Sequence, residues 1–261
     1  MRTRMLFSLG AALLAATPLL AADLNVDTVD DQLPAEEGNF VTGSNVAIVD
    51  TGDGSVGIFA TRLAGIGYTA SLIPVSSNFS VLSQYDLVIL PTSHGSACCN
   101  GTLSGLAADY HDFIAGGGCL YVGQPNPFNM PNGDSAIPWV PYELTLNAFY
   151  DTADCPPYVD DPQHCMAEGV SGSELPFPGD TVLSMGPEWT VVDRGASTNS
   201  PGLFDADYGS GHVLVELAHP SSGALCPYSD AAFENMVTCC LNPGPVPVLD
   251  SSWGRIKNEY R

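Results

Sequence analysis

The stretch from Tyr85 to Phe128 constrains the fold more than any other part of the chain. The run 86–90 is dominated by leucine, valine and isoleucine without polar alternation, as a strand buried on both faces of a parallel sheet requires, and Pro91 is expected to end it. Apolar residues then recur from Leu103 to Ile114 at the spacing of one helix face, and the glycines at 116–118 end that helix. A second short strand is predicted at 119–122. The stretch therefore predicts a β-α-β crossover, and in such sheets ligands bind beyond the carboxyl ends of the strands, here at 123–126.

Further elements follow from the rest of the sequence. Apolar runs predict strands at 45–49, about 70–75, 181–185, 189–192 and 211–218, the last two joined by a polar loop. Helical periodicity predicts a first helix with Val56, Phe59, Ala60 and Leu63 on one face. A final helix is expected at 230–241, with Ser229 as its N-cap and with Phe233, Met236, Val237 and Cys240 on its buried face. The predicted fold class is α/β, a flavodoxin-like three-layer sandwich with a mainly parallel central sheet.

Residues 52–57, Gly-Asp-Gly-Ser-Val-Gly, formally match the G-x-G-x-x-G fingerprint of dinucleotide-binding proteins. Asp53 would oppose a pyrophosphate, and the next predicted strand ends without the acidic residue that binds the ribose. We therefore interpret the segment as a tight turn in which Asp53 or Ser55 caps the following helix, and we expect no cofactor.

The N-terminus has the three regions of a secretory signal peptide. Arg2 and Arg4 precede an apolar run from Met5 to Leu20, and small residues follow at 21–22. We expect a signal peptide at 1–22, cleavage before Asp23, and an exported bacterial protein that is secreted or periplasmic. No other run approaches the ~18 apolar residues of a membrane span.

The charge balance is strongly acidic. Seven Lys and Arg residues oppose 29 Asp and Glu residues, which gives a formal net charge of −22. Such a surface repels phosphate backbones and anionic lipids, so binding of nucleic acid or of a membrane surface is disfavoured. Two explanations remain open, solubility in a salty medium and weak cation binding by acidic loops, and the first is favoured.

The motif at 85–91, Tyr-Asp-Leu-Val-Ile-Leu-Pro, followed by a helix and a glycine-led strand, resembles the class I glutamine amidotransferase-like superfamily, including its DJ-1/PfpI and ThuA-like branches. Residues 209–220, GSGHVLVELAHP, resemble the late strand of that family, and 230–241 resembles its closing helix. The resemblance implies one domain at 44–241 with an insertion at 125–165. An acidic leader at 23–43 would precede it, and a proline-rich linker with a basic tail at 242–261 would follow.

The same resemblance bears on catalysis. Catalytic members carry a cysteine at the sharp turn after the strand that corresponds to 119–123, and a His-Pro-Glu segment supplies a base with its orienting carboxylate. The matching position here is Gln124, which cannot attack a carbonyl. His219 and Pro220 match, but Ser221 stands where the family has glutamate. The resemblance thus implies the fold without the catalytic nucleophile.

The insertion is rich in proline and aromatic residues and follows the carboxyl end of a strand, where a lid or binding wall would lie. Trp139 and Tyr142 could stack on a sugar or on a partner. Alternatively they pack the insertion against the domain, which is the favoured interpretation.

Eight cysteines in an exported chain favour disulfides. Cys155 and Cys165 bracket a proline-rich loop and are the expected pair. The vicinal pairs, 98–99 and 239–240, are expected to send each sulfur to a different partner. A metal cluster of His94, Cys98 and Cys99 is disfavoured because it lacks a C-x-x-C spacing, so we expect no metal site.

The sequence favours a non-catalytic binding or interaction module. Its ligand would be a small molecule, a glycan or a protein, in a site whose candidate residues lie at strand ends and in the insertion: Thr92, Ser93, His94, Gln124, Asn126, Trp139 and His219. One alternative is a hydrolase in which His219 activates Ser93 or a water molecule. Another is a structural component displayed at the surface through the tail at 250–261.

Overall fold

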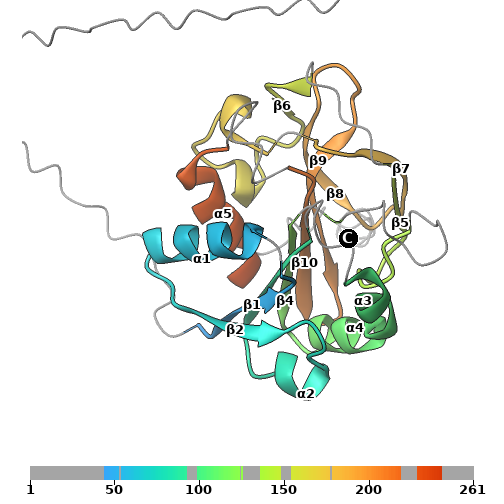
Figure 1. Cartoon of the computed structure of the whole chain (residues 1–261). Helices are drawn as coiled ribbons and strands as arrows, with labels where there is room; N and C mark the ends of the chain where they lie inside the picture. The colour runs from blue at the N-terminus through green and yellow to red at the C-terminus, as the bar shows by residue number, and fades with distance from the viewer. Residues whose placement is uncertain are drawn as a thin grey trace, which may run out of the picture. The chain divides into compact units, whose positions relative to one another are not determined.

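The computed structural model describes residues 44–52, 54–92, 99–123, 125, 136–147, 154–176, 178–218 and 228–242. Its centre is an eight-stranded sheet of order β2-β1-β3-β4-β10-β9-β8-β6 (Figure 1). The strands are β1 (Val46–Asp50), β2 (Ala70–Pro74), β3 (Leu87–Pro91), β4 (Cys119–Gly123), β6 (Tyr158–Val159), β8 (Thr190–Arg194), β9 (Pro201–Tyr208) and β10 (Gly211–Glu216). The predicted α/β sandwich is confirmed.

Five strands form the parallel part of the sheet. The neighbours β2, β1, β3, β4 and β10 all pair in parallel, which is the 2-1-3-4-5 order of flavodoxin-like folds. The apolar runs of β3 and β4 are buried along their whole length, as strands covered on both faces must be. The strands β9, β8 and β6 extend the sheet in antiparallel fashion beyond β10.

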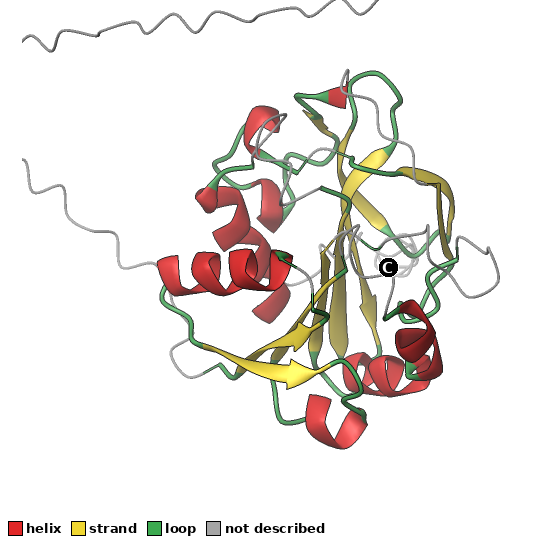
Figure 2. Cartoon of the chain, in the orientation of Figure 1, coloured by secondary structure: helices red, strands yellow, loops and turns green. Residues whose placement is uncertain are grey.

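Helices cover both faces of the sheet (Figure 2). On one face, α1 (Ser55–Gly65) and α5 (Asp230–Leu241) bury Phe59, Leu63, Phe233 and Met236 against β3, β4 and β10. On the other face, α3 (Asn100–Gly105) and α4 (Ala107–Ala115) bury Leu103, Tyr110 and Phe113. A short helix, α2 (Phe79–Leu82), packs on α4.

Some element boundaries differ from the predictions. The single helix expected from Leu103 to Ile114 is two helices that meet at Leu106, whose backbone N–H bonds both Thr102 and Leu103 and tightens the turn there. The α1 N-cap is Gly54 without a side-chain cap, so the capping role expected of Ser55 is wrong, and Asp53 lies outside the described residues. The polar loop expected between β8 and β10 is wrong, because it contains the eight-residue strand β9.

A second, two-stranded sheet pairs β5 (Leu144–Asn147), which falls within 125–165, with β7 (Thr181–Met185), which follows that range. Between β6 and β7 run two short 3-10 helices, η3 (Cys165–Ala167) and η4 (Gly172–Glu174). In the part of the chain that the structure describes, no helix is both long and apolar enough to cross a membrane. The leader, the signal segment and the C-terminal tail lie outside the described residues.

The predicted cap of α5 is confirmed and can be tested. Ser229 is extended, and its hydroxyl accepts a hydrogen bond of 3.1 Å from the Ala232 N–H. Ser229→Ala is expected to lower the free energy of unfolding by about 1 kcal/mol, because one N–H group at the helix start loses its partner. Ser229→Asp should retain most of the stability. Urea denaturation measures both changes, and an unchanged midpoint for Ser229→Ala would contradict the capping role.

Candidate functional site

The carboxyl ends of β1, β3 and β4 are joined by threonine hydroxyl groups. Thr51 Oγ1 donates to the Pro91 carbonyl at 2.8 Å, and Thr92 Oγ1 lies 3.3 Å from the Gly123 carbonyl, which also accepts from the Thr92 N–H at 2.9 Å. Thr92 is completely buried. Its hydroxyl group therefore ties the ends of β3 and β4 together, and the ligand contact that the sequence suggested for Thr92 stays a prediction.

The other predicted site residues divide into two groups. Trp139 is 0% exposed and belongs to the core on the α3/α4 side, so its prediction as a ligand-stacking residue is wrong and the packing interpretation holds. The hydroxyl of Tyr142 donates to the Asp207 carbonyl at 2.7 Å, and its ring packs edge-on against Trp189 and Tyr208. The remaining predicted residues lie outside the described part of the chain: Ser93, His94, Gln124, Asn126 and His219.

Two disulfides anchor α5. Cys240 bonds Cys119 at the start of β4, and Cys239 bonds Cys165 in η3. The expected Cys155–Cys165 pair is therefore wrong, although Cys155 is itself disulfide-bonded. The prediction that vicinal cysteines take separate partners is confirmed for 239–240. Because consecutive helical residues point about 100° apart, one sulfur reaches the sheet and the other reaches the insertion.

At the same edge as Thr92, the last residue of β10 is a buried glutamate. Glu216 is the register partner of Gly123, and its side chain lies on the α1/α5 face beside Phe59. Its Oε1 atom accepts a hydrogen bond of 3.2 Å from the Tyr228 hydroxyl, while Oε2 has no partner among the described residues. We name Arg62, Tyr121, Glu216 and Tyr228 the Glu216 cluster.

Arg62 supplies the positive charge of this cluster. Its guanidinium lies 4.1 Å from the centre of the Tyr228 ring, donates to the Tyr228 carbonyl at 3.0 Å, and approaches Asp230 at 3.8 Å. Burial raises the pKa of Glu216 to about 7, even though Tyr121, Arg62 and Tyr228 all favour the ionised form. Near neutral pH the carboxyl group is therefore partly protonated and can both donate and accept a hydrogen bond.

Two more buried carboxyl groups lie in neighbouring segments. Burial raises the pKa of Asp180 to about 7. Burial also raises the pKa of Asp193 well above its usual value; the backbone N–H groups of Gly202 and Leu203 lower it in part, and the charge of Glu216 raises it further. Like Glu216, Asp180 is therefore partly protonated near neutral pH.

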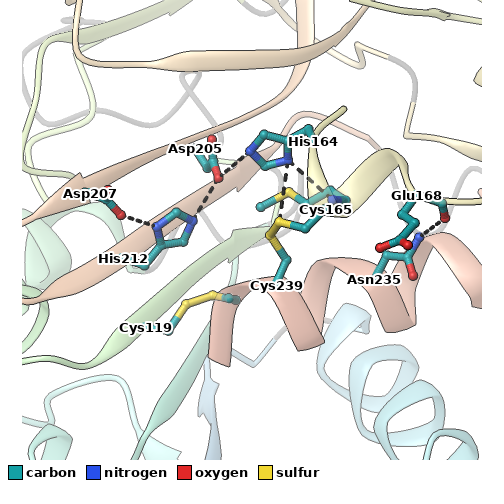
Figure 3. The surroundings of a disulfide bond; sticks show 11 residues. Cys119, His164, Cys165, Glu168, Asp205, Asp207, His212, Asn235 and Cys239 are labelled. Atoms are coloured by element: carbon teal, nitrogen blue, oxygen red, sulfur yellow. Dashed lines mark hydrogen bonds and ion pairs between the residues drawn. A yellow bond between two sulfur atoms is a disulfide. The ribbon is translucent and has the colours of Figure 1, made fainter. Parts of the chain in front are cut away.

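A second polar constellation lies at the opposite end of β10. His212 and Glu216 are four residues apart on one face, which corresponds to roughly 13 Å along a strand. His212 bonds Asp207 through Nδ1 and Asp205 through Nε2, both at 2.9 Å (Figure 3). His164 Nε2 approaches the same Asp205 Oδ2 atom at 3.1 Å. We name His164, Asp205, Asp207 and His212 the Asp205 network.

The geometry of the Asp205 network assigns its protons. Both ring nitrogens of His212 face carboxylates, so both donate and the ring is an imidazolium. Burial lowers the pKa of His212, but its bonds to Asp205 and Asp207 outweigh burial and the net shift is upward. The pKa of Asp205, which burial alone would raise, is held below its usual value by His164 and His212. With both nitrogens occupied, His212 serves as a buried cation rather than as a base.

Sequence reasoning missed both constellations. Glu216 is the single acidic residue in the apolar run 213–218, Val-Leu-Val-Glu-Leu-Ala. An acidic residue inside a predicted buried strand needs a compensating partner, and this feature could have identified Glu216 as a candidate site residue. Asp205 and Asp207 alternate with apolar residues, a period-2 pattern that predicts a strand with one polar face. Their pairing with His164, about forty residues earlier in the chain, had no local signal.

Solved structures share this fold. One is a protein from Thermoplasma acidophilum that is described as a proposed component of GMP synthase, with a TM-score of 0.54 and 13% identity over 82% of this chain and 98% of that chain. Another is a cytoplasmic protein of Salmonella typhimurium, with a TM-score of 0.52 and 14% identity over 76% of this chain and 98% of that chain. The likeness is one of fold. No family model matches the chain, and neither does any protein with curated information.

Proposed function

We propose that the chain is an exported, non-catalytic binding module whose ligand lies at the carboxyl edge of β3, β4 and β10. One observation carries the proposal: β4 ends at Gly123, between the ends of β3 and β10. The next residue, at the position where the resemblance implies a catalytic cysteine, is Gln124. An amide side chain forms hydrogen bonds but is not a nucleophile, so this position suits binding rather than acyl transfer.

The chemistry of the edge favours an uncharged, polar ligand. The Gln124 amide that follows β4 can donate and accept hydrogen bonds but carries no charge. The net charge of −22 disfavours anions. Ligands with hydroxyl or amide groups, such as sugars and small amides, fit this environment. The two disulfides that hold α5 agree with export into an oxidising compartment.

The absence of acyl-transfer chemistry is the first test. The protein is expected to show no glutaminase activity and no labelling by serine-directed active-site probes. Thiol-directed probes should find no cysteine that reacts as readily as an active-site cysteine. Gln124→Cys alone should create no turnover, since Ser221 gives His219 no carboxylate partner. Turnover of a simple ester or amide that His219→Ala abolishes in a folded protein would replace the binding proposal with a hydrolase.

Ligand binding is the second test. A thermal-shift screen of neutral sugars and small amides is expected to yield compounds that raise the melting temperature of the wild-type protein but not that of Gln124→Ala. Gln84→Ala is the matched control, because Gln84 is exposed and shortly precedes the amino end of β3, the far end of the strand. Compounds that stabilise all three proteins equally would place the binding site elsewhere.

A further inference from the structure

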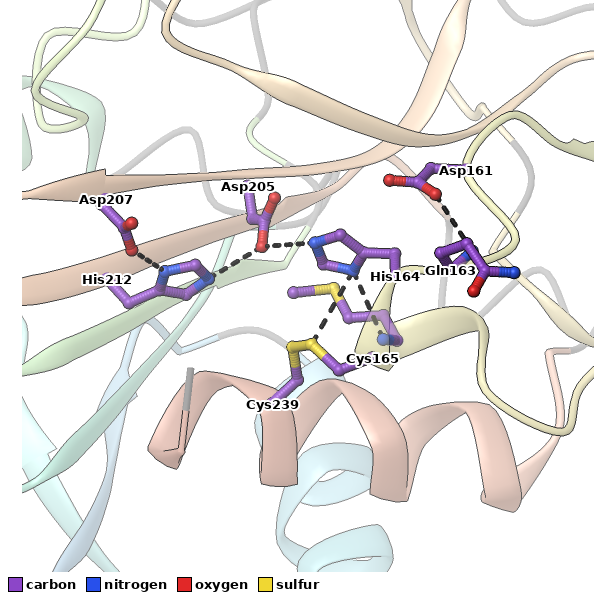
Figure 4. A network of polar contacts seen from close by, with 9 residues as sticks. Asp161, Gln163, His164, Cys165, Asp205, Asp207, His212 and Cys239 are labelled. Atoms are coloured by element: carbon purple, nitrogen blue, oxygen red, sulfur yellow. Dashed lines mark hydrogen bonds and ion pairs between the residues drawn. A yellow bond between two sulfur atoms is a disulfide. The ribbon is translucent and has the colours of Figure 1, made fainter. Parts of the chain in front are cut away.

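The Cys165–Cys239 disulfide lies against a histidine. His164 Nδ1 is 3.9 Å from Cys165 Sγ, and a ring nitrogen of His164 and the two sulfur atoms all lie within 4.8 Å of one another (Figure 4). This is the arrangement of three metal ligands, two soft sulfurs and one imidazole nitrogen. It joins η3 in the insertion to α5 in the main domain.

Asp205 sets the tautomer of His164. Its Oδ2 atom lies 3.1 Å from His164 Nε2, so Nε2 carries the hydrogen and donates it, while Nδ1 keeps its lone pair. The lone pair points toward Met166 N–H, at 3.3 Å, on the side of the ring where the sulfurs lie. In zinc sites, the ring nitrogen of a ligating histidine that does not bind the metal usually donates a hydrogen bond to a carboxylate or a carbonyl group. Here His212 and Asp207 fix that carboxylate in turn.

The spacing suits a small tetrahedral ion. Zn–S bonds of about 2.3 Å and Zn–N bonds of about 2.0 Å place the ligand atoms of a tetrahedral site roughly 3–4 Å apart. The three atoms here need only small side-chain rotations to reach that spacing once the sulfur–sulfur bond is open. His164 is 14% exposed, which leaves a solvent molecule access to a fourth position.

We propose that His164, Cys165 and Cys239 form a zinc-binding site that exists only when the Cys165–Cys239 disulfide is reduced. Two small thiols transfer two electrons to the disulfide, which becomes two cysteine thiols, while the small thiols become a disulfide themselves. Zn²⁺ then replaces the two thiol protons, which leave to solvent, and His164 Nδ1 donates its lone pair to the metal. The weak 3.3 Å contact from the Met166 N–H is the hydrogen bond that the metal displaces.

The other disulfide of α5 offers a contrast. Cys119 and Cys240 are 3% and 2% exposed, and the register partner of Cys119 is His212. Both nitrogens of His212 already donate to aspartates, so that ring has no lone pair for a metal. Among the described residues, a metal site that forms when a disulfide is reduced is therefore specific to the Cys165–Cys239 pair.

Cobalt spectroscopy on the full chain tests the proposal. A water-soluble phosphine reduces the protein, taking up one oxygen atom from water for each disulfide, and Co²⁺ is then titrated in. The reduced wild type is expected to show thiolate-to-cobalt charge-transfer bands and tetrahedral visible bands that one equivalent of Zn²⁺ removes. The oxidised protein should show neither. Replacing both Cys165 and Cys239 by serine should remove the charge-transfer band, and His164→Ala should bind Co²⁺ at least tenfold more weakly.

Matched variants separate this site from other thiols. Asp205→Asn should weaken Co²⁺ binding roughly 10–100-fold, as expected for the outer partner of a ligating histidine. His111→Ala, on the opposite face of the sheet, should bind Co²⁺ like the wild type. Circular dichroism confirms the fold of each protein. Thiolate bands that persist when both cysteines are replaced, cobalt binding that His164→Ala leaves unchanged, or loss of the fold on reduction without any binding would each overturn the proposal.

Discussion

Replacing both Cys119 and Cys240 by alanine is expected to lower the free energy of unfolding by about 4 kcal/mol. Because Cys239, next to Cys240, is already bonded to Cys165, the bond closes a further loop that runs mainly from Cys119 to Cys165, about 46 residues, and it restricts that part of the unfolded chain. It also fastens α5 to β4, a central strand of the eight-stranded sheet. No other disulfide joins two central elements among the described residues.

Equilibrium denaturation measures this loss, and the slope m identifies its origin. If the disulfide acts through the unfolded state, the variant exposes more surface on unfolding and m increases. Thr238→Ala, an exposed position on the same helix, is the control and should change stability by no more than about 0.5 kcal/mol. A loss below about 1 kcal/mol for the double variant would show that packing of α5, rather than its cross-link, holds the helix in place.

The parallel core could be predicted from the sequence because its strands are buried on both faces and carry almost no polar residues. The run in β3 and the glycines before β4 located both strands to within a residue or two. The α5 helix was predicted at its observed bounds, since Ser229 marks its start and the apolar face continues to its last turn. These elements are specified by local sequence.

The antiparallel extension could not be predicted in the same way. Asp205 and Asp207 made β9 resemble a polar loop, yet most of the strand is buried because His212 and His164 form hydrogen bonds with its carboxylates. That compensation comes from residues on other elements. The disulfide pairing failed for a similar reason: Cys155 and Cys165 are close in sequence, but α5 brings Cys239 to Cys165 in space.

Most residues of the predicted site lie outside the described part of the chain, so its position stays a prediction. The carboxyl edge of β3 and β4 was the expected place, and Thr92 lies there, but its hydroxyl holds the two strands together. Glu216 was missed because an acidic residue in an apolar strand has no local explanation. It is tolerated at that position because burial keeps its proton on, beside Tyr228 and Arg62.

Glu216 should therefore make the protein less stable as the pH rises. Its pKa is raised from 4.5 in the unfolded chain to about 7 in the folded protein, so between these values the folded state binds more protons than the unfolded state. The stabilisation is complete below about pH 4.5, declines across the window and is lost above about pH 7. Integrated over that window, the change is about 3 kcal/mol.

Glu216→Gln isolates this contribution. Glutamine keeps the shape of the side chain and an oxygen that can accept from the Tyr228 hydroxyl, but it cannot ionise. The free energy of unfolding of the variant is expected to match that of the wild type near pH 4.5 and to exceed it by up to about 3 kcal/mol at pH 8, because the wild type must then bury a charge or take up a proton.

Part of the slope of the unfolding free energy against pH should remain in Glu216→Gln, because Asp180 also has a pKa of about 7. Glu168→Gln removes an exposed carboxylate and should leave the slope unchanged. Urea denaturation at several pH values measures all three proteins, and parallel profiles for the wild type and Glu216→Gln would show that Glu216 ionises in the folded protein as readily as in the unfolded chain.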